Sequence, residues 1–166
     1  YCGDGECESG ENCLNCEQDC KCSSNQECSA GTCVNLCDLT SASWNYSTPV
    51  GSSIVSGTPV RLNILGTNCA GKTINFAVFE KDGALNPDDS VSISPSSITF
   101  PSSGTNAYLL WNSVYTPDTD GGQSDPPEYY FRASVSGYSE SITSSNNGYD
   151  DPLLLKVNQR VTCGNG

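Results

Sequence analysis

The residues best suited to chemistry in this sequence are carboxylates that lie among closely spaced cysteines near its start. Calcium takes about six to eight hard oxygen ligands, and tight glycine turns add backbone carbonyl oxygens to carboxylates. Crosslinks between the cysteines would hold such residues together, so the pattern predicts a calcium site. Its expected ligands are Asp4, Glu6, Glu11 and Asp19. The alternative is an acidic, solvated face on a disulfide knot.

Two other groups of residues are weaker candidates for metal binding. Asp118, Asp120 and Asp125 lie in one loop, but their spacing is not that of an EF-hand, which favours an unliganded polar loop. Zinc is a rival in the cysteine-rich segment. It would use Cys13, Cys16, Cys20 and Cys22, although thiolate sites belong mainly to reducing compartments.

Residues 66–73, with the letters GTNCAGKT, match the phosphate-binding pattern G-x-x-x-x-G-K-[ST]. Such a loop needs a helix directly after its lysine and threonine, because the helix N-terminus attracts the phosphate. Residues 74–80 instead alternate and are rich in β-branched and aromatic side chains, which favours a strand. We therefore interpret residues 66–73 as a hairpin loop between two antiparallel strands.

The composition of the 166-residue chain excludes several functions. A formal net charge of -12 disfavours nucleic acid and anionic membranes as partners. Histidine is absent, which removes Ser-His-Asp and Cys-His catalysis, so a non-enzymatic protein is expected. No apolar run approaches the roughly 20 residues of a membrane-spanning helix. Methionine is absent too, which indicates a processed product or a piece of a longer protein.

The eleven cysteines indicate the compartment in which the chain folds. Nine of them lie within residues 1–37, a segment too small for a hydrophobic core. Disulfide-stapled secreted modules have this density, because crosslinks replace the missing apolar burial. We expect an oxidising, extracellular location.

The elements that must position these residues follow from the hydrophobic pattern. Apolar residues recur with period two in five runs, and no helical stripe is present, which indicates half-buried strands. About seven such strands in roughly 120 residues are typical of an immunoglobulin-like β-sandwich, with a jelly roll as the alternative. The chain is therefore predicted to be all-β. The alternating residues are Val60, Leu62 and Ile64; Ile74, Phe76 and Val78; Ala107, Leu109 and Trp111; Tyr129, Phe131, Ala133 and Val135; and Leu153, Leu155 and Val157.

Three segments are expected along the chain. Residues 1–37 form the disulfide-rich acidic module, residues 38–160 the sandwich, and residues 161–166 a tail or the start of a next repeat. The last possibility arises because the letters CGDG from Cys2 recur as CGNG from Cys163.

Only one disulfide is predicted from position. Cys69 is the only cysteine inside the predicted sandwich and Cys37 lies just before its first strand, so we expect these two to pair. The other cysteines of the module allow many connectivities, which stay open. They are Cys2, Cys7, Cys13, Cys16, Cys20, Cys22, Cys28 and Cys33.

Residues 2–20, CGDGECESGENCLNCEQDC, resemble the C-G-D/N-G-x-C-x-x-G-E-x-C-x-x-C-x-x-D-C modules of secreted and cell-surface proteins from archaea and bacteria. The later sequence, with GTNCAGKTINFAVFE and EYYFRASVSG, resembles immunoglobulin-like domains of prokaryotic surface proteins and appendages. Such domains serve adhesion, scaffolding and filament building. The resemblance thus implies a non-enzymatic role at the cell surface.

The expected function is that of a structural subunit or tandem repeat of an extracellular filament, assembled head-to-tail with copies of itself. A C-terminal strand within residues 151–162 could be lent to a neighbouring sandwich. Asn45 begins the N-x-[ST] glycosylation motif, and the Ser/Thr-rich loops suit O-linked sugars. The alternative function is a secreted adhesin or carbohydrate-binding module, with Tyr108, Tyr115, Tyr130 and Tyr138 as candidate exposed contacts.

Overall fold

The computed structural model describes residues 1–45, 53–82, 87–117, 126–144 and 154–161. Within them the chain is all-β, with no helix, and it divides into two compact units, Tyr1–Asp38 and Leu39–Gly166. None of the described residues forms a helix long and apolar enough to cross a membrane. The strands are β1 (Gln26–Ser29), β2 (Thr32–Asn35), β3 (Asp38–Asn45), β4 (Ile54–Val55), β5 (Pro59–Thr67), β6 (Thr73–Glu80), β7 (Asp89–Val91), β8 (Ser97–Thr99), β9 (Asn106–Asn112), β10 (Glu128–Val135), β11 (Ser141–Thr143) and β12 (Leu155–Asn158).

The first unit contains a single hairpin, in which β1 pairs antiparallel with β2. Its two-residue turn has positive φ at both Ala30 (48°) and Gly31 (82°). Turns of this kind match the twist of the flanking strands. The rest of the unit has little regular structure, as expected for a segment stabilised by crosslinks.

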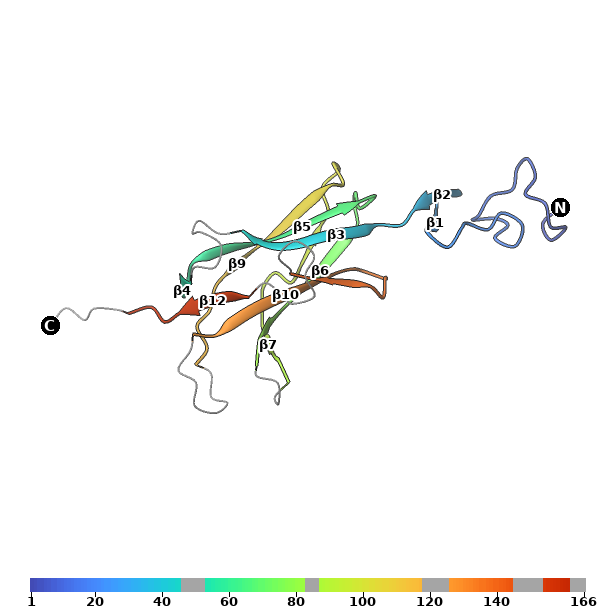
Figure 1. Ribbon diagram of the computed structural model, residues 1–166. Helices are drawn as coiled ribbons and strands as arrows, with labels where there is room; N and C mark the ends of the chain where they lie inside the picture. The colour runs from blue at the N-terminus through green and yellow to red at the C-terminus, as the bar shows by residue number, and fades with distance from the viewer. Residues whose placement is uncertain (46–52, 83–86, 118–125, 145–153, 162–166) are drawn as a thin grey trace. The chain divides into compact units, whose positions relative to one another are not determined.

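The second unit contains two sheets (Figure 1). The smaller sheet has the order β3-β5-β9, and the larger has the order β4-β12-β10-β6-β7. Two short strands complete the larger sheet, because β8 pairs with β6 beyond the end of β7, and β11 pairs with β10 beyond the end of β12. This arrangement is compatible with an immunoglobulin-like sandwich.

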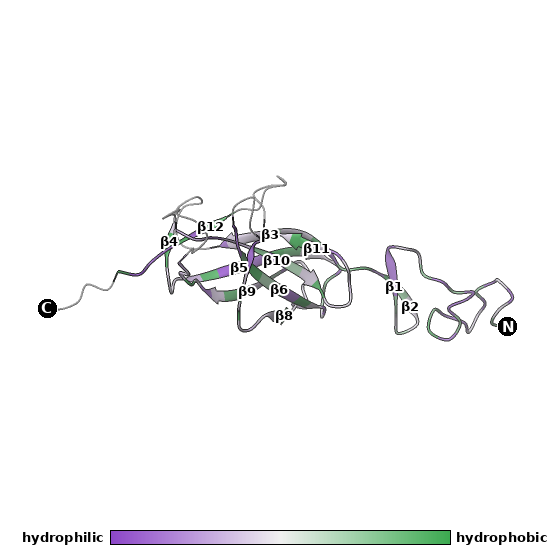
Figure 2. Cartoon of the chain, turned by 90° about the horizontal axis from the view of Figure 1, so that it is seen from below, coloured by the Kyte–Doolittle hydropathy of each residue, from purple (hydrophilic) through white to green (hydrophobic). Residues whose placement is uncertain are grey.

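The core lies between these sheets, and the predicted alternation is confirmed. Figure 2 shows apolar and polar residues alternating along the strands. Every predicted core residue that the structure describes is buried, including Leu62, Val78 and Phe131 at 0% exposure, while Leu153 lies outside the described residues. The faces alternate because successive side chains of a strand point to opposite sides.

An aromatic cluster occupies the core. The Phe131 ring meets Trp44 edge-on, with centroids 4.8 Å apart, and Trp111 meets Tyr129 in the same way at 5.6 Å. Edge-to-face pairs are favourable because the positive ring edge contacts the negative face of its partner. The cluster joins β3 and β9 of one sheet to β10 of the other.

Residues 66–73 are not the predicted hairpin loop. They connect β5 to β6, which belong to different sheets, so the segment crosses from one layer of the sandwich to the other. Asn68 and Gly71 have positive φ (57° and 74°), the conformations that glycine and asparagine adopt most readily. A strand follows, as expected, and the helix needed for phosphate binding does not form.

Candidate functional site

Four disulfides organise the acidic module. Each joins cysteines 11 to 15 residues apart, so the crosslinks overlap along the chain. The bonded state of so many cysteines indicates folding in an oxidising environment. The pairs are Cys2–Cys16, Cys7–Cys20, Cys13–Cys28 and Cys22–Cys33.

These bonds exclude the zinc interpretation. Zinc binds cysteine as the thiolate, and each of the four cysteines proposed as ligands is oxidised. Two groups of potential metal ligands lie close together in the described part of the chain, and both contain disulfide cysteines. One is Cys13, Cys22 and Cys33, and the other is Cys2, Cys16 and Asp19.

Asp19 acts as an acceptor inside the module. Its carboxylate accepts hydrogen bonds from the backbone N–H groups of Gly3 and Gly5, the latter at 3.1 Å. Its Oδ2 also lies 3.3 Å from Cys16 Sγ, which is bonded to Cys2 and therefore has no proton to donate. Both glycines have positive φ, which aims their N–H groups at one carboxylate. Asp19 thus ties the first turn to the segment between Cys16 and Cys20.

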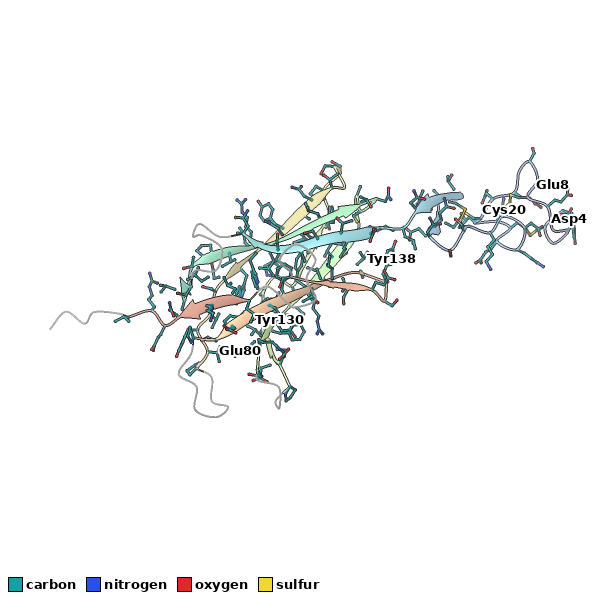
Figure 3. All side chains as sticks on the ribbon, in the orientation of Figure 1. Asp4, Glu8, Cys20, Glu80, Tyr130 and Tyr138 are labelled. Carbon is teal, nitrogen blue, oxygen red and sulfur yellow. A yellow bond between two sulfur atoms is a disulfide. The ribbon has the colours of Figure 1, made fainter. Side chains whose placement is uncertain are left out.

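Three other carboxylates converge on a positive group. The amino group of Tyr1 donates a hydrogen bond of 2.7 Å to Glu8 and lies 3.5 Å from both Asp4 and Glu11. Figure 3 shows Asp4 and Glu8 near the N-terminus of the module. The hydrogen bond to Glu8, with the charge of Glu11, raises the pKa of the amino group above its usual value, although desolvation opposes the shift. We call Asp4, Glu8 and Glu11 the acidic cluster.

The structure does not bring the four predicted calcium ligands to one point. Asp4 and Glu11 belong to the acidic cluster, whereas Asp19 binds backbone N–H groups. Within the described residues, no three of the four have carboxylate oxygens within 4.8 Å of one another. Glu8 was not among the predicted ligands, although it directly follows Cys7, because its position does not distinguish it from the other acidic residues of the module.

The remaining predicted site residues have different outcomes. Cys37 and Cys69 are both buried and disulfide-bonded, and their pairing with each other stays a prediction. Asn45 is exposed at the end of β3. The weaker calcium ligands Asp118, Asp120 and Asp125 lie outside the described residues, as does Cys163.

A second polar network lies on the outer side of the larger sheet. Tyr130 is only 3% exposed, so its assignment as an exposed contact was wrong. Its hydroxyl donates a hydrogen bond of 2.7 Å to Asp88, which also accepts from Lys81 Nζ at 3.1 Å and from the backbone N–H of Asp82 at 3.1 Å. The Tyr130 ring stacks on Phe79 at 5.2 Å. This network fastens the segment before β7 to β6 and β10.

The network shifts two pKa values in opposite directions. Burial and the hydrogen bond to Asp88 raise the pKa of Tyr130 to about 12. Desolvation raises the pKa of Asp88, but the hydrogen bonds from Tyr130 and Lys81 outweigh it and leave that pKa below its ordinary value. The hydrogen bond therefore persists from the pH at which Asp88 becomes ionised up to about 12, where Tyr130 would lose its proton.

We expect Tyr130→Phe to lower the free energy of unfolding by about 1–2 kcal/mol, since a hydrogen bond to a charged acceptor is lost. Because folding raises the pKa of Tyr130, its hydrogen bond contributes fully to stability at pH values below the pKa of an unfolded tyrosine, near 10. This contribution is lost as the pH rises towards about 12. Urea unfolding across that range should show a steeper decline for the wild type than for the variant. Parallel pH profiles would contradict the assignment.

The site and fold together define a class: an all-β protein in which an acidic, disulfide-rich module precedes a sandwich-like domain. No known protein family matches the chain, and no curated protein is significantly similar to it.

Proposed function

We propose that this chain is a structural unit of an extracellular filament or appendage, joined head-to-tail to further copies. The observation that carries the proposal is the path of the chain through the sandwich. β3 starts at one end of the sandwich and β12 ends at the opposite end (Figure 1). Domains with entry and exit at opposite ends connect in series without a reversal of the chain.

Two further observations support an extracellular structural role. The crosslinks of the module require an oxidising setting, which secretion provides. The exposed Asn45 is accessible to a glycan-transferring enzyme. The lending of a C-terminal strand has less support, because β12 pairs within its own sandwich with β10 and β4.

Electron microscopy of the native material tests the assembly. We expect fibres with a regular axial repeat, in which the sandwich and module alternate. Isolated, uniform particles without an axial repeat would refute the head-to-tail assembly. Mass spectrometry of the same material tests glycan attachment at Asn45.

Calcium binding by the acidic module is a further part of the proposal. Asp4 and Glu11, two of the predicted ligands, lie with Glu8 around the Tyr1 amino group. To bind calcium, these carboxylates would have to release that group and move closer together. A chelator is expected to lower the melting temperature of the module, since a ligand bound only to the folded state stabilises it. Glu11→Gln should remove most of that shift, whereas the exposed Glu17→Gln should keep it. An unchanged melting temperature, with no calcium by elemental analysis, would refute the site.

An adhesin or carbohydrate-binding module is the second candidate, favoured by Tyr108. This side chain is 48% exposed, and the Arg61 guanidinium lies 4.6 Å from its ring centroid. Exposed aromatic rings beside polar groups are suited to stacking on sugars. Saturable binding on a glycan array that is lost in Tyr108→Ala would favour this function over a purely structural one.

A further inference from the structure

The smaller sheet ends in β9, and the outer edge of this strand offers a contact that the proposed head-to-tail assembly does not use. β9 is the last strand of the sheet β3-β5-β9, and among the described residues its backbone pairs only with β5. β8 approaches β9, but the ladder of β8 is with β6. Unpaired N–H and C=O groups along an edge form a template for another strand.

The direction of these backbone groups follows from the hydrogen bonds at both ends of β9. The carbonyl of Thr105 accepts from Gly66 N–H at 3.0 Å, and Ser113 N–H donates to the Thr58 carbonyl at 3.0 Å, so both residues face β5. Along an antiparallel strand the direction alternates with each residue. The residues that face the free edge are therefore Asn106, Tyr108, Leu110 and Asn112.

β9 lacks the usual protection of an edge strand. Its sequence, NAYLLWN, contains no charged residue, proline or glycine. Leu110 is 56% exposed and Tyr108 48%, and Leu65 on the neighbouring β5 is 48% exposed. The only charge on β5 is that of Arg61. In a chain with a net charge of -12, this is a surface on which two copies meet without repulsion between carboxylates.

The strand is also complementary to itself. An antiparallel pairing of two β9 strands about a two-fold axis beside Leu109 keeps all seven residues in register. The outward backbone groups then meet one another, so four residue pairs each exchange two hydrogen bonds. A small residue faces a large one on the inner side, and a ring faces an aliphatic side chain on the outer side. The facing pairs are Asn106 with Asn112, Ala107 with Trp111, and Tyr108 with Leu110.

We propose that the free edge of β9 pairs antiparallel with β9 of a second copy of this chain, which joins two three-stranded sheets into one of six strands. The contact is isologous, so it closes on itself and yields a dimer. The contact lies along the side of the sandwich, whereas head-to-tail assembly would use its two ends. The β9 pairing therefore does not depend on head-to-tail assembly. In a filament it would join two neighbouring fibres side by side.

Sedimentation velocity of the full chain between about 10 μM and about 1 mM tests the pairing, with a reversible dimer expected to increase with concentration. Hydrogen exchange by NMR gives the second readout. The amides of Tyr108 and Leu110 should gain protection with concentration, whereas those of Leu109 and Trp111 should be protected throughout because they face β5. A chain that stays monomeric at the highest concentration, or alternate amides that gain no protection, would overturn the proposal.

Substitutions separate strand pairing from a general apolar contact. Leu110→Pro removes an outward N–H without touching the ladder to β5, as proline does on an edge strand. We expect it to weaken association about thirtyfold, because two hydrogen bonds of the symmetric dimer are lost. Leu65→Lys is the matched control, since it removes a leucine that is also about half exposed from the same face but not from the edge, and it should change association by about twofold or less.

A second variant covers the case in which Leu110→Pro disturbs β9. Tyr108→Lys places a charge on the edge beside Arg61, which is a natural means of blocking strand addition. It should abolish the dimer while the melting temperature stays close to that of the wild type. Full association of either folded edge variant, or equal loss of association in Leu65→Lys, would overturn the pairing.

Discussion

Reduction of the disulfides is expected to unfold residues 1–38 while the sandwich stays folded. Within this unit the buried apolar residues are all cysteines: Cys13, Cys16, Cys20 and Cys37. Reduction therefore removes the crosslinks and disperses the residues that form the core. Each disulfide closes a loop of 11 to 15 residues and contributes about 3 kcal/mol to the stability of the module, because it restricts the unfolded chain. Their sum exceeds what a module of this size gains by other means.

Two-dimensional NMR before and after reduction measures this effect residue by residue. Signals of residues 1–38 should collapse to the positions of an unfolded chain, while those of β5, β6 and β10 stay dispersed. The variant Cys22→Ala/Cys33→Ala is the graded control, because its bond spans the existing β1–β2 hairpin and its loss should disturb the module less than Cys7→Ala/Cys20→Ala. A reduced module that keeps its dispersion would show that other contacts stabilise it.

Phe131→Ala is expected to cost the sandwich about 3–5 kcal/mol, a large part of the stability of a small domain. Phe131 is 0% exposed, with its ring centroid 4.8 Å from that of Trp44 and 6.1 Å from that of Phe76. Truncation removes the apolar contacts and leaves a cavity that the surrounding rings fill only partly. The ring joins the two sheets, so the loss affects both.

Urea unfolding followed by tryptophan fluorescence measures this loss, because Trp44 lies against Phe131. Leu110→Ala is the control. Its side chain is 56% exposed, so the change should stay within about 0.5 kcal/mol. A similar effect of the two substitutions would mean that the aromatic cluster does not contribute to the core as described.

The strands could be predicted because their signal is local. Alternation along Val60, Leu62 and Ile64 shows which side chains share a face, and that face must be buried. The connection between β5 and β6 could not be predicted in this way. Its letters indicate a turn, but whether the next strand pairs in the same sheet or crosses to the other depends on contacts distant in sequence.

The candidate site shows the same limit. Acidic residues beside glycines and cysteines were recognisable, yet the role of each carboxylate depends on which groups the fold brings to it. Asp19 meets two backbone N–H groups from residues 14 and 16 positions away. Tyr130 could be expected on the surface from its place in the alternation, but Asp88 and Phe79 cover it. These contacts span loops, where sequence spacing does not set distance.

Composition and period-two patterning were thus sufficient for the all-β class, the disulfide-rich module and the sandwich core, because cysteine density and alternation act over a few residues. Only the tertiary structure decided the disulfide pairs, the layer to which each strand belongs, the partners of Asp19 and Asp88, and the edge position of β9. The physical reason is that each of these depends on the closure of loops between distant residues. Many closures satisfy the same local pattern, and the packing of the whole domain selects one.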